Sequence, residues 1–128
     1  MPRVRAAGAL IYAKDFQRLS AFYRDLLGMT KRDSDSRHQV IENADHELTI
    51  HELPLHLANT VTIRTPPVPR EDAPIKLYFT VPSLEAVKER VRRNGGLMFG
   101  DVERYKSMYT RHGYDCEGNI FQLRAPAP

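Results

Sequence analysis

The residues best placed to do chemistry lie on one side of a short alternating segment, Lys76–Val81. Apolar residues occupy every second position of this segment, so a strand here would have one apolar face. Lys76, Tyr78 and Thr80 occupy the other positions and would face a water-filled cavity. A partly buried lysine either pairs with an anion or loses its charge. The hypothesis is that Lys76 anchors a carboxylate, phosphate or enolate; the alternative is a lysine at a strand end whose ammonium group reaches water.

Three histidines offer a second possible chemistry, because imidazole is a common metal ligand. His46, His51 and His56 recur at five-residue spacing. Odd spacing on a strand places neighbouring side chains on opposite faces, and no His-Glu-x-x-His helix surrounds these residues. The pattern therefore favours three separate histidines, and a partial metal site that uses His51 is the alternative.

The elements that must position these residues occur twice. Residues 8–29 and 76–97 superpose without a gap at a constant shift of 68 residues. Each copy opens with an alternating strand and continues into a helix whose N-cap is Asp15 or Ser83. Each helix has an apolar stripe, and Gly28 and Gly96 occupy the positions where a left-handed residue is expected to end the helix.

Short strand candidates follow each predicted helix. They are Thr30–Asp35, His38–Glu42 and Glu47–Glu52 in the first half, and Leu97–Phe99, Met108–Tyr114 and Asn119–Arg124 in the second. A proline-rich connector, Thr65–Pro74, separates the halves. The sequence therefore predicts the order βαβββ, linker, βαβββ.

Composition limits the classes of function. The 128 residues suffice for one ordinary domain, and no apolar run approaches the roughly 18 residues that suggest a membrane span. The single cysteine, Cys116, cannot form an internal disulfide, which fits a cytoplasmic location. The net charge of +3 is not concentrated in an uninterrupted basic cluster. We therefore expect neither a nucleic-acid partner nor a membrane partner.

Two sequence motifs resemble those of a known family. The first is Tyr12–Asp15 followed by Ala21–Gly28, and the second is the late turn Asp115–Asn119 leading into Ile120–Leu123. Together with the repeat, they make the chain resemble the vicinal oxygen chelate superfamily, which includes glyoxalase I, bleomycin-resistance proteins and extradiol dioxygenases. The resemblance implies an α+β fold of two βαβββ modules in tandem, forming a curved mixed sheet around a central cup. It also implies a single domain over residues 1–128, with module 1 at about 4–54, a linker at 55–73 and module 2 at about 74–126.

The resemblance also implies four positions at which metal-dependent members hold a divalent ion, two in each module. In this chain three of them correspond to Gly8, Lys76 and Gln122, and the fourth corresponds best to Thr49, with His51 as the next choice. Glycine has no ligating side chain, and an ammonium group has no lone pair. We therefore predict that no metal or other cofactor is bound. A divalent metal held by His51 and Gln122 is the alternative.

The predicted function is the metal-independent binding of a small anionic or aromatic molecule in the cup, as in bleomycin-resistance proteins. The alternative is a lyase, isomerase or dioxygenase-like enzyme with a site rebuilt around His51, Lys76 and Gln122, and no catalytic residue is assigned. Family members are usually dimeric, so we also expect a homodimer. The predicted ligand-binding residues are Tyr12, Thr49, His51, Lys76, Tyr78, Gln122 and Arg124, joined by Tyr109 or Arg111 from the preceding strand; Leu10, Thr80 and Ile120 complete the inward-facing set.

Overall fold

The structure is a computed structural model that describes residues 7–127. The predicted start of module 1 near residue 4 lies outside the described residues. The chain divides between Thr62 and Ile63 into two compact units. Each unit contains one copy of the predicted repeat.

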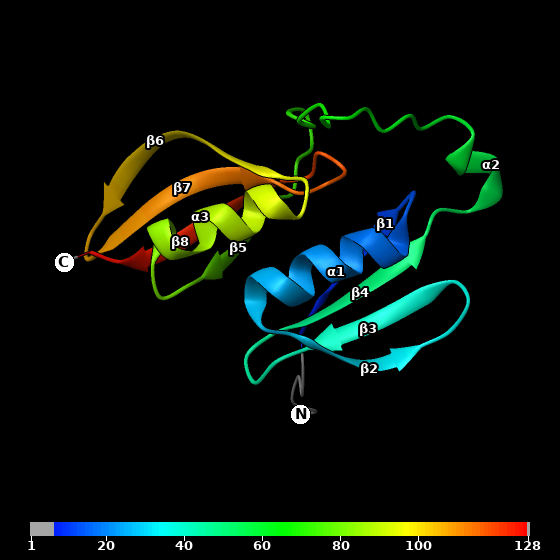
Figure 1. The fold of residues 1–128 in the computed structure, drawn as a ribbon, viewed down its shortest axis with the longest axis horizontal. Helices are drawn as coiled ribbons and strands as arrows, with labels where there is room; N and C mark the ends of the chain where they lie inside the picture. The colour runs from blue at the N-terminus through cyan, green and yellow to red at the C-terminus, as the bar shows by residue number, and fades with distance from the viewer. Residues whose placement is uncertain (1–6, 128) are drawn as a thin grey trace, which may run out of the picture. The chain divides into compact units, whose positions relative to one another are not determined.

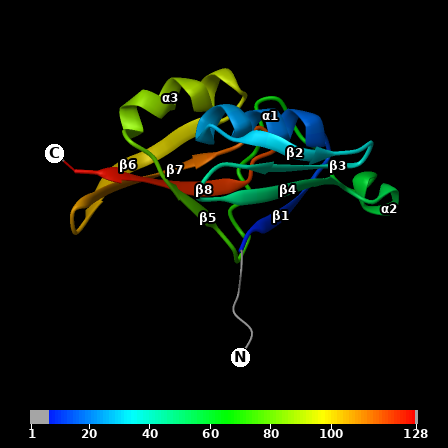
Figure 2. The ribbon, with the colours of Figure 1, turned by 90° about the horizontal axis from the view of Figure 1, so that it is seen from below.

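The first unit is a four-stranded mixed sheet with one long helix on one face (Figures 1 and 2). The strands lie in the order β1-β4-β3-β2; β1 is parallel to β4, and the other neighbours are antiparallel. A short helix, α2, follows the sheet. The elements are β1 (Ala9–Ala13), α1 (Phe16–Leu27), β2 (Thr30–Ser34), β3 (His38–Glu42), β4 (Glu47–Glu52) and α2 (Leu55–Ala58).

Helix α1 forms and ends where the sequence predicts. The Asp15 carboxylate accepts a hydrogen bond from the backbone N–H of Arg18 at 3.2 Å, which satisfies one donor that the first turn leaves open. Gly28 ends the helix in the left-handed conformation, with φ 63°. One side of the helix is buried against the sheet, through Phe16, Leu19, Ser20, Phe22, Tyr23 and Leu26.

The second unit repeats this architecture. Its strands lie in the order β5-β8-β7-β6, with β5 parallel to β8 and the other neighbours antiparallel. Helix α3 lies on one face of this sheet (Figure 2). The elements are β5 (Leu77–Thr80), α3 (Leu84–Arg93), β6 (Leu97–Tyr105), β7 (Met108–Tyr114) and β8 (Ile120–Pro126).

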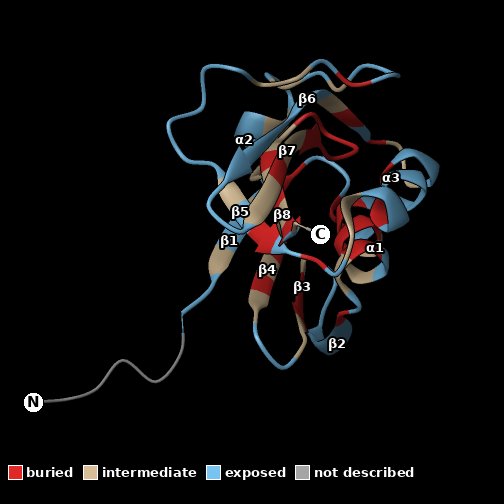
Figure 3. Cartoon of the chain, turned by 90° about the vertical axis from the view of Figure 1, so that its left-hand side faces the viewer, coloured by how far each residue is buried: buried red, intermediate tan, exposed pale blue. Residues whose placement is uncertain are grey.

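Helix α3 begins as predicted but ends earlier. Ser83 accepts from the backbone N–H of Ala86 at 3.3 Å, and Val87 and Val91 are buried. The prediction that Gly96 adopts the left-handed conformation is wrong, because the residue with the positive φ, 92°, is Gly95. The helix stops at Arg93 because Asn94 caps it, with its side-chain amide donating to the carbonyl of Arg90 at 2.8 Å. Both α1 and α3 are amphipathic, since each is buried along one side and exposed along the other (Figure 3).

Two further differences concern segments with little apolar patterning. The strand predicted at Leu97–Phe99 continues as β6 to Tyr105, past an irregularity in its pairing between Phe99 and Glu103. The linker contains the short helix α2, which buries none of its residues. The α+β class and the tandem βαβββ order are confirmed, whereas the single domain and the enclosed cup stay predictions. Within the described residues, no helix is long and apolar enough to cross a membrane.

Candidate functional site

The predicted polar face of the second unit exists, and it lies opposite α3. Strand register places Tyr78 beside Gln122 and Gln122 beside His112. In the next row, Thr80 pairs with Arg124. Directly paired residues share a face of the sheet, so these side chains lie together. The alternate residues of β8 are buried on the α3 side, as the alternation predicts: Phe121, Leu123 and Ala125.

The prediction that Tyr109 or Arg111 joins this face is wrong. Register pairs Tyr109 with Ala125 and Arg111 with Leu123, which places both on the α3 side of the sheet. Arg111 also donates from Nε to the carbonyl of Gly100 at 3.0 Å. The residue of β7 that does face Gln122 is His112, which no sequence motif indicated.

Lys76 and His112 form a hydrogen-bonded pair. Lys76 immediately precedes β5 and is more exposed than expected, and its Nζ lies 3.1 Å from Nε2 of His112. Because an ammonium group only donates, Nε2 accepts and the imidazole proton is on Nδ1. Burial lowers the pKa of His112 below its ordinary value, and the charge of Lys76 lowers it further against an opposing effect of Glu103. His112 is therefore held in its neutral form.

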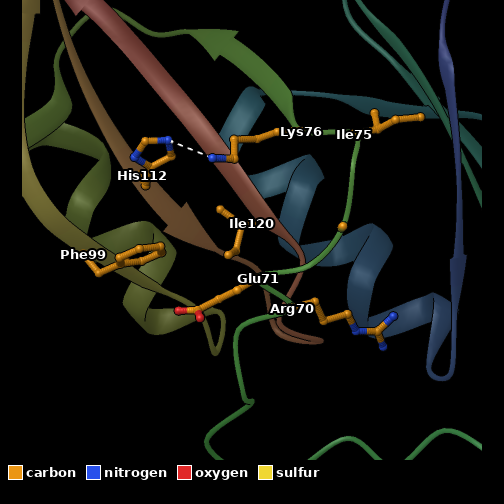
Figure 4. A pocket seen from close by; sticks show the side chains of 8 residues that line it. Arg70, Glu71, Ile75, Lys76, Phe99, His112 and Ile120 are labelled. Atoms are coloured by element: carbon orange, nitrogen blue, oxygen red, sulfur yellow. Dashed lines mark hydrogen bonds between the residues drawn. The ribbon is translucent and has the colours of Figure 1, made fainter.

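The pair lines a pocket within the second unit (Figure 4). The pocket has a volume of about 260 Å³. Its apolar wall includes the ring of Phe99, which stacks on His112 with centroids 6.1 Å apart. Its charged groups are two cations and one carboxylate. The lining residues are Arg70, Glu71, Ala73, Ile75, Lys76, Phe99, His112 and Ile120.

A second polar cluster on the same face surrounds Arg124. Its guanidinium carbon lies 3.6 Å from the centroid of the Tyr78 ring, which is a close cation–π contact. Its Nε donates to Oε1 of Gln122 at 2.8 Å. The guanidinium group is therefore held by a ring against one face and by a hydrogen bond in its plane. Three predicted site residues, Tyr78, Gln122 and Arg124, are thus brought into one cluster.

The predicted site residues of the first unit also share one face. Register pairs Leu10 with Thr49 and Tyr12 with His51, on the side of the sheet opposite α1. The rings of Tyr12 and His51 meet edge to face, with centroids 5.7 Å apart. Nδ1 of His51 lies 2.7 Å from the carbonyl oxygen of Glu52, so this nitrogen donates.

The residues at the family's metal positions do not fit a divalent ion. A Cβ added at Gly8 would lie 2.8 Å from the carbonyl oxygen of Glu47, so a ligating side chain has no room there without a shift of backbone. Lys76 offers only donors, and the amide oxygen of Gln122 already accepts from Arg124. Within residues 7–127, no group of three or more His, Cys, Asp or Glu side chains is arranged to hold a metal.

Comparison with protein families identifies a glyoxalase-like domain over residues 8–124. The chain therefore belongs to the glyoxalase-like family, within the vicinal oxygen chelate superfamily that the sequence phrases indicated. No curated protein sequence matches the chain.

Solved structures with the same fold cover almost the whole chain. A mutant of FosX from Listeria monocytogenes, a fosfomycin resistance protein, was solved with Mn(II) and a dihydroxypropylphosphonic acid; it superposes with a TM-score of 0.71 at 17% identity, covering 98% of this chain and 93% of that one. A hypothetical protein from S. aureus gives 0.67 at 16% identity, with 97% and 95% covered. A glyoxalase/bleomycin resistance protein/dioxygenase family enzyme from Burkholderia phytofirmans gives 0.64 at 17%, with 91% and 94% covered. At these identities the likeness establishes the fold alone.

Proposed function

We propose that this protein binds a small anionic molecule on the polar face of its second unit, without a metal ion. The observation that carries the proposal is the pairing of Lys76 with His112. A lysine paired with a carboxylate is neutralised, whereas one paired with a neutral imidazole keeps its full positive charge. The apolar surfaces of Phe99 and Ile120 line the same pocket, so an anion with an aromatic or other apolar body suits it.

The charges of the pocket support an anionic ligand. Arg70 and Lys76 contribute two positive charges and Glu71 contributes one negative charge, while His112 stays neutral. Within the described part of the chain, neither Lys76 nor Arg70 has a carboxylate within ion-pair distance. An incoming carboxylate would gain a charge-assisted hydrogen bond from Lys76.

Metal removal tests the metal-independent part of this proposal. We expect protein purified without affinity-tag metal, and then dialysed against EDTA, to bind benzoate as tightly as untreated protein in calorimetry. We also expect elemental analysis to find no stoichiometric metal, because catalytic sites usually keep three protein ligands and this donor set lacks them. A bound Zn, Ni, Mn or Fe ion that is lost in His51→Ala or Gln122→Ala would instead support the metal-dependent lyase, isomerase or dioxygenase-like enzyme.

We also propose that the protein is a homodimer. Within residues 7–127, the outermost strands of each sheet pair on one side only, and small proteins often protect such edges by two-fold association. The segment after the first sheet also exposes large apolar side chains, with Leu55 78% exposed and Leu57 43% exposed. Sedimentation velocity at micromolar concentration should give a species of about twice the 14.7 kDa chain mass. Leu55→Glu should lower the measured mass of that species. A species of one chain mass for the unmodified protein would contradict the dimer.

A further inference from the structure

Arg124 carries a positive charge that no acidic side chain of the described residues neutralises. Its Nε is engaged with Gln122, and one side of its guanidinium plane lies on the Tyr78 ring. These contacts fix the plane, but they leave the two terminal nitrogens without a hydrogen-bond partner among residues 7–127. A planar guanidinium fork with both terminal nitrogens available matches the two oxygens of a carboxylate.

Lys76, on the same face, is another cation without a carboxylate partner among the described residues. Lys76 comes from the β5 side of the sheet, and its side chain reaches His112 on β7. Strand β8 lies between β5 and β7 and carries Gln122. The ammonium group is thus hydrogen-bonded to a residue of β7, whereas the guanidinium of Arg124 lies over the Tyr78 ring of β5. Their contact residues, Tyr78 and His112, lie in one row of the sheet with Gln122 between them, and strands two places apart are separated by roughly 10 Å at the backbone.

The acidic groups nearest this face do not neutralise the two cations. Glu71 lines the pocket beside Lys76, and Glu103 occupies the β6 position in the row of Thr110 and Arg124. Neither carboxylate is within ion-pair distance of Lys76 or Arg124. Two like charges on one face repel each other, and a ligand with two negative groups would relieve that repulsion.

From this geometry we propose that the ligand is a short dicarboxylate: Arg124, which stacks on Tyr78 and donates from Nε to Gln122, binds one carboxylate, and Lys76 binds the other. The inference rests on the proposed anion-binding function and specifies its ligand class. Gln122 lies between Tyr78 and His112, the residues that contact the two cations, and offers its amide N–H groups to the middle of the ligand. The role of Arg124 depends on its planar fork as well as on its charge.

The test compares glutarate with pentanoate, which has the same number of carbons and one carboxylate fewer. In calorimetry at low ionic strength, glutarate should bind at least tenfold more tightly than pentanoate. Arg124→Met should lower glutarate affinity at least tenfold, to within about twofold of the affinity for pentanoate. Arg124→Lys keeps the charge but loses the fork and the ring contact, so it should also weaken glutarate, by at least threefold. Thermal melts of both variants show whether the fold is retained.

The outcomes separate this inference from the function on which it rests. If glutarate and pentanoate bind with equal affinity and Lys76→Met weakens both, the ligand is not a dicarboxylate. The proposed binding of a single anionic group at Lys76 would still hold. If Arg124→Lys binds glutarate as tightly as the wild-type protein does, the planar fork is not required. Arg124 would then act only as a point charge. Failure of every carboxylate to bind the wild-type protein would overturn the proposed function itself.

Discussion

Replacement of Lys76 by methionine is expected to weaken the binding of benzoate by tenfold to a hundredfold. A hydrogen bond to a charged group contributes roughly 1.5–3 kcal/mol, and each 1.4 kcal/mol is about a factor of ten in affinity. The fold should be retained, because Lys76 is exposed and methionine keeps most of the methylene stem. Calorimetry with benzoate measures the loss, and Lys76→Arg is the matched control that keeps the charge.

The same variant has a readout that needs no ligand. The positive charge of Lys76 is one of the causes that lower the pKa of His112, so Lys76→Met should raise that pKa toward its ordinary value. Burial would still hold it below that value. An NMR titration of the imidazole protons measures the change. If benzoate affinity is unaltered while the pKa of His112 rises, the pair exists but Lys76 is not the anion anchor.

The fold was predictable because the repeat consists of short-range sequence patterns. Asp15 and Ser83 are both N-caps that accept from the helix three residues later, and each precedes an apolar stripe. The alternation in β5 and β8 likewise fixed which side chains are buried. Strand β6 beyond Phe99 was missed because most of its residues are exposed, so hydrophobic alternation carries no signal there.

The candidate site was only partly predictable, because a site depends on pairing between strands. His112 could have been found by counting back across the turn Asp115–Asn119: Tyr114 pairs with Ile120, so His112 must face Gln122. That count also excludes Tyr109 and Arg111 from the polar face. The stacking of Arg124 on Tyr78 could not have been found this way, because it depends on the side-chain torsions of a long residue as well as on register.

The late turn that the family phrase identified also holds the linker beside the pocket. Asp115 is fully buried, and its carboxylate accepts from the backbone N–H groups of Glu117 and Asn119 at 2.9 and 3.1 Å. Gly118 then accepts from the backbone N–H of Arg70 at 2.8 Å. Gly118 has φ 86°, and a Cβ added there would lie 2.2 Å from the carbonyl oxygen of Val68. The turn and the linker segment that carries Arg70 therefore meet where no side chain fits.

Gly118→Ala is accordingly expected to destabilise the protein by roughly 2–5 kcal/mol, of which roughly 1–2 comes from the left-handed backbone and roughly 1–3 from the clash. Gly28→Ala is the matched control: its φ is also positive, at 63°, but nothing lies within 4 Å of the added Cβ. That variant should lose only the backbone part, roughly 1–2 kcal/mol. Urea unfolding midpoints, compared at equal slope, measure both losses. Equal losses in the two variants would mean that the linker moves aside at little cost. A larger loss at Gly118 would mean that this contact holds the segment carrying Arg70 in place, and with it one wall of the pocket.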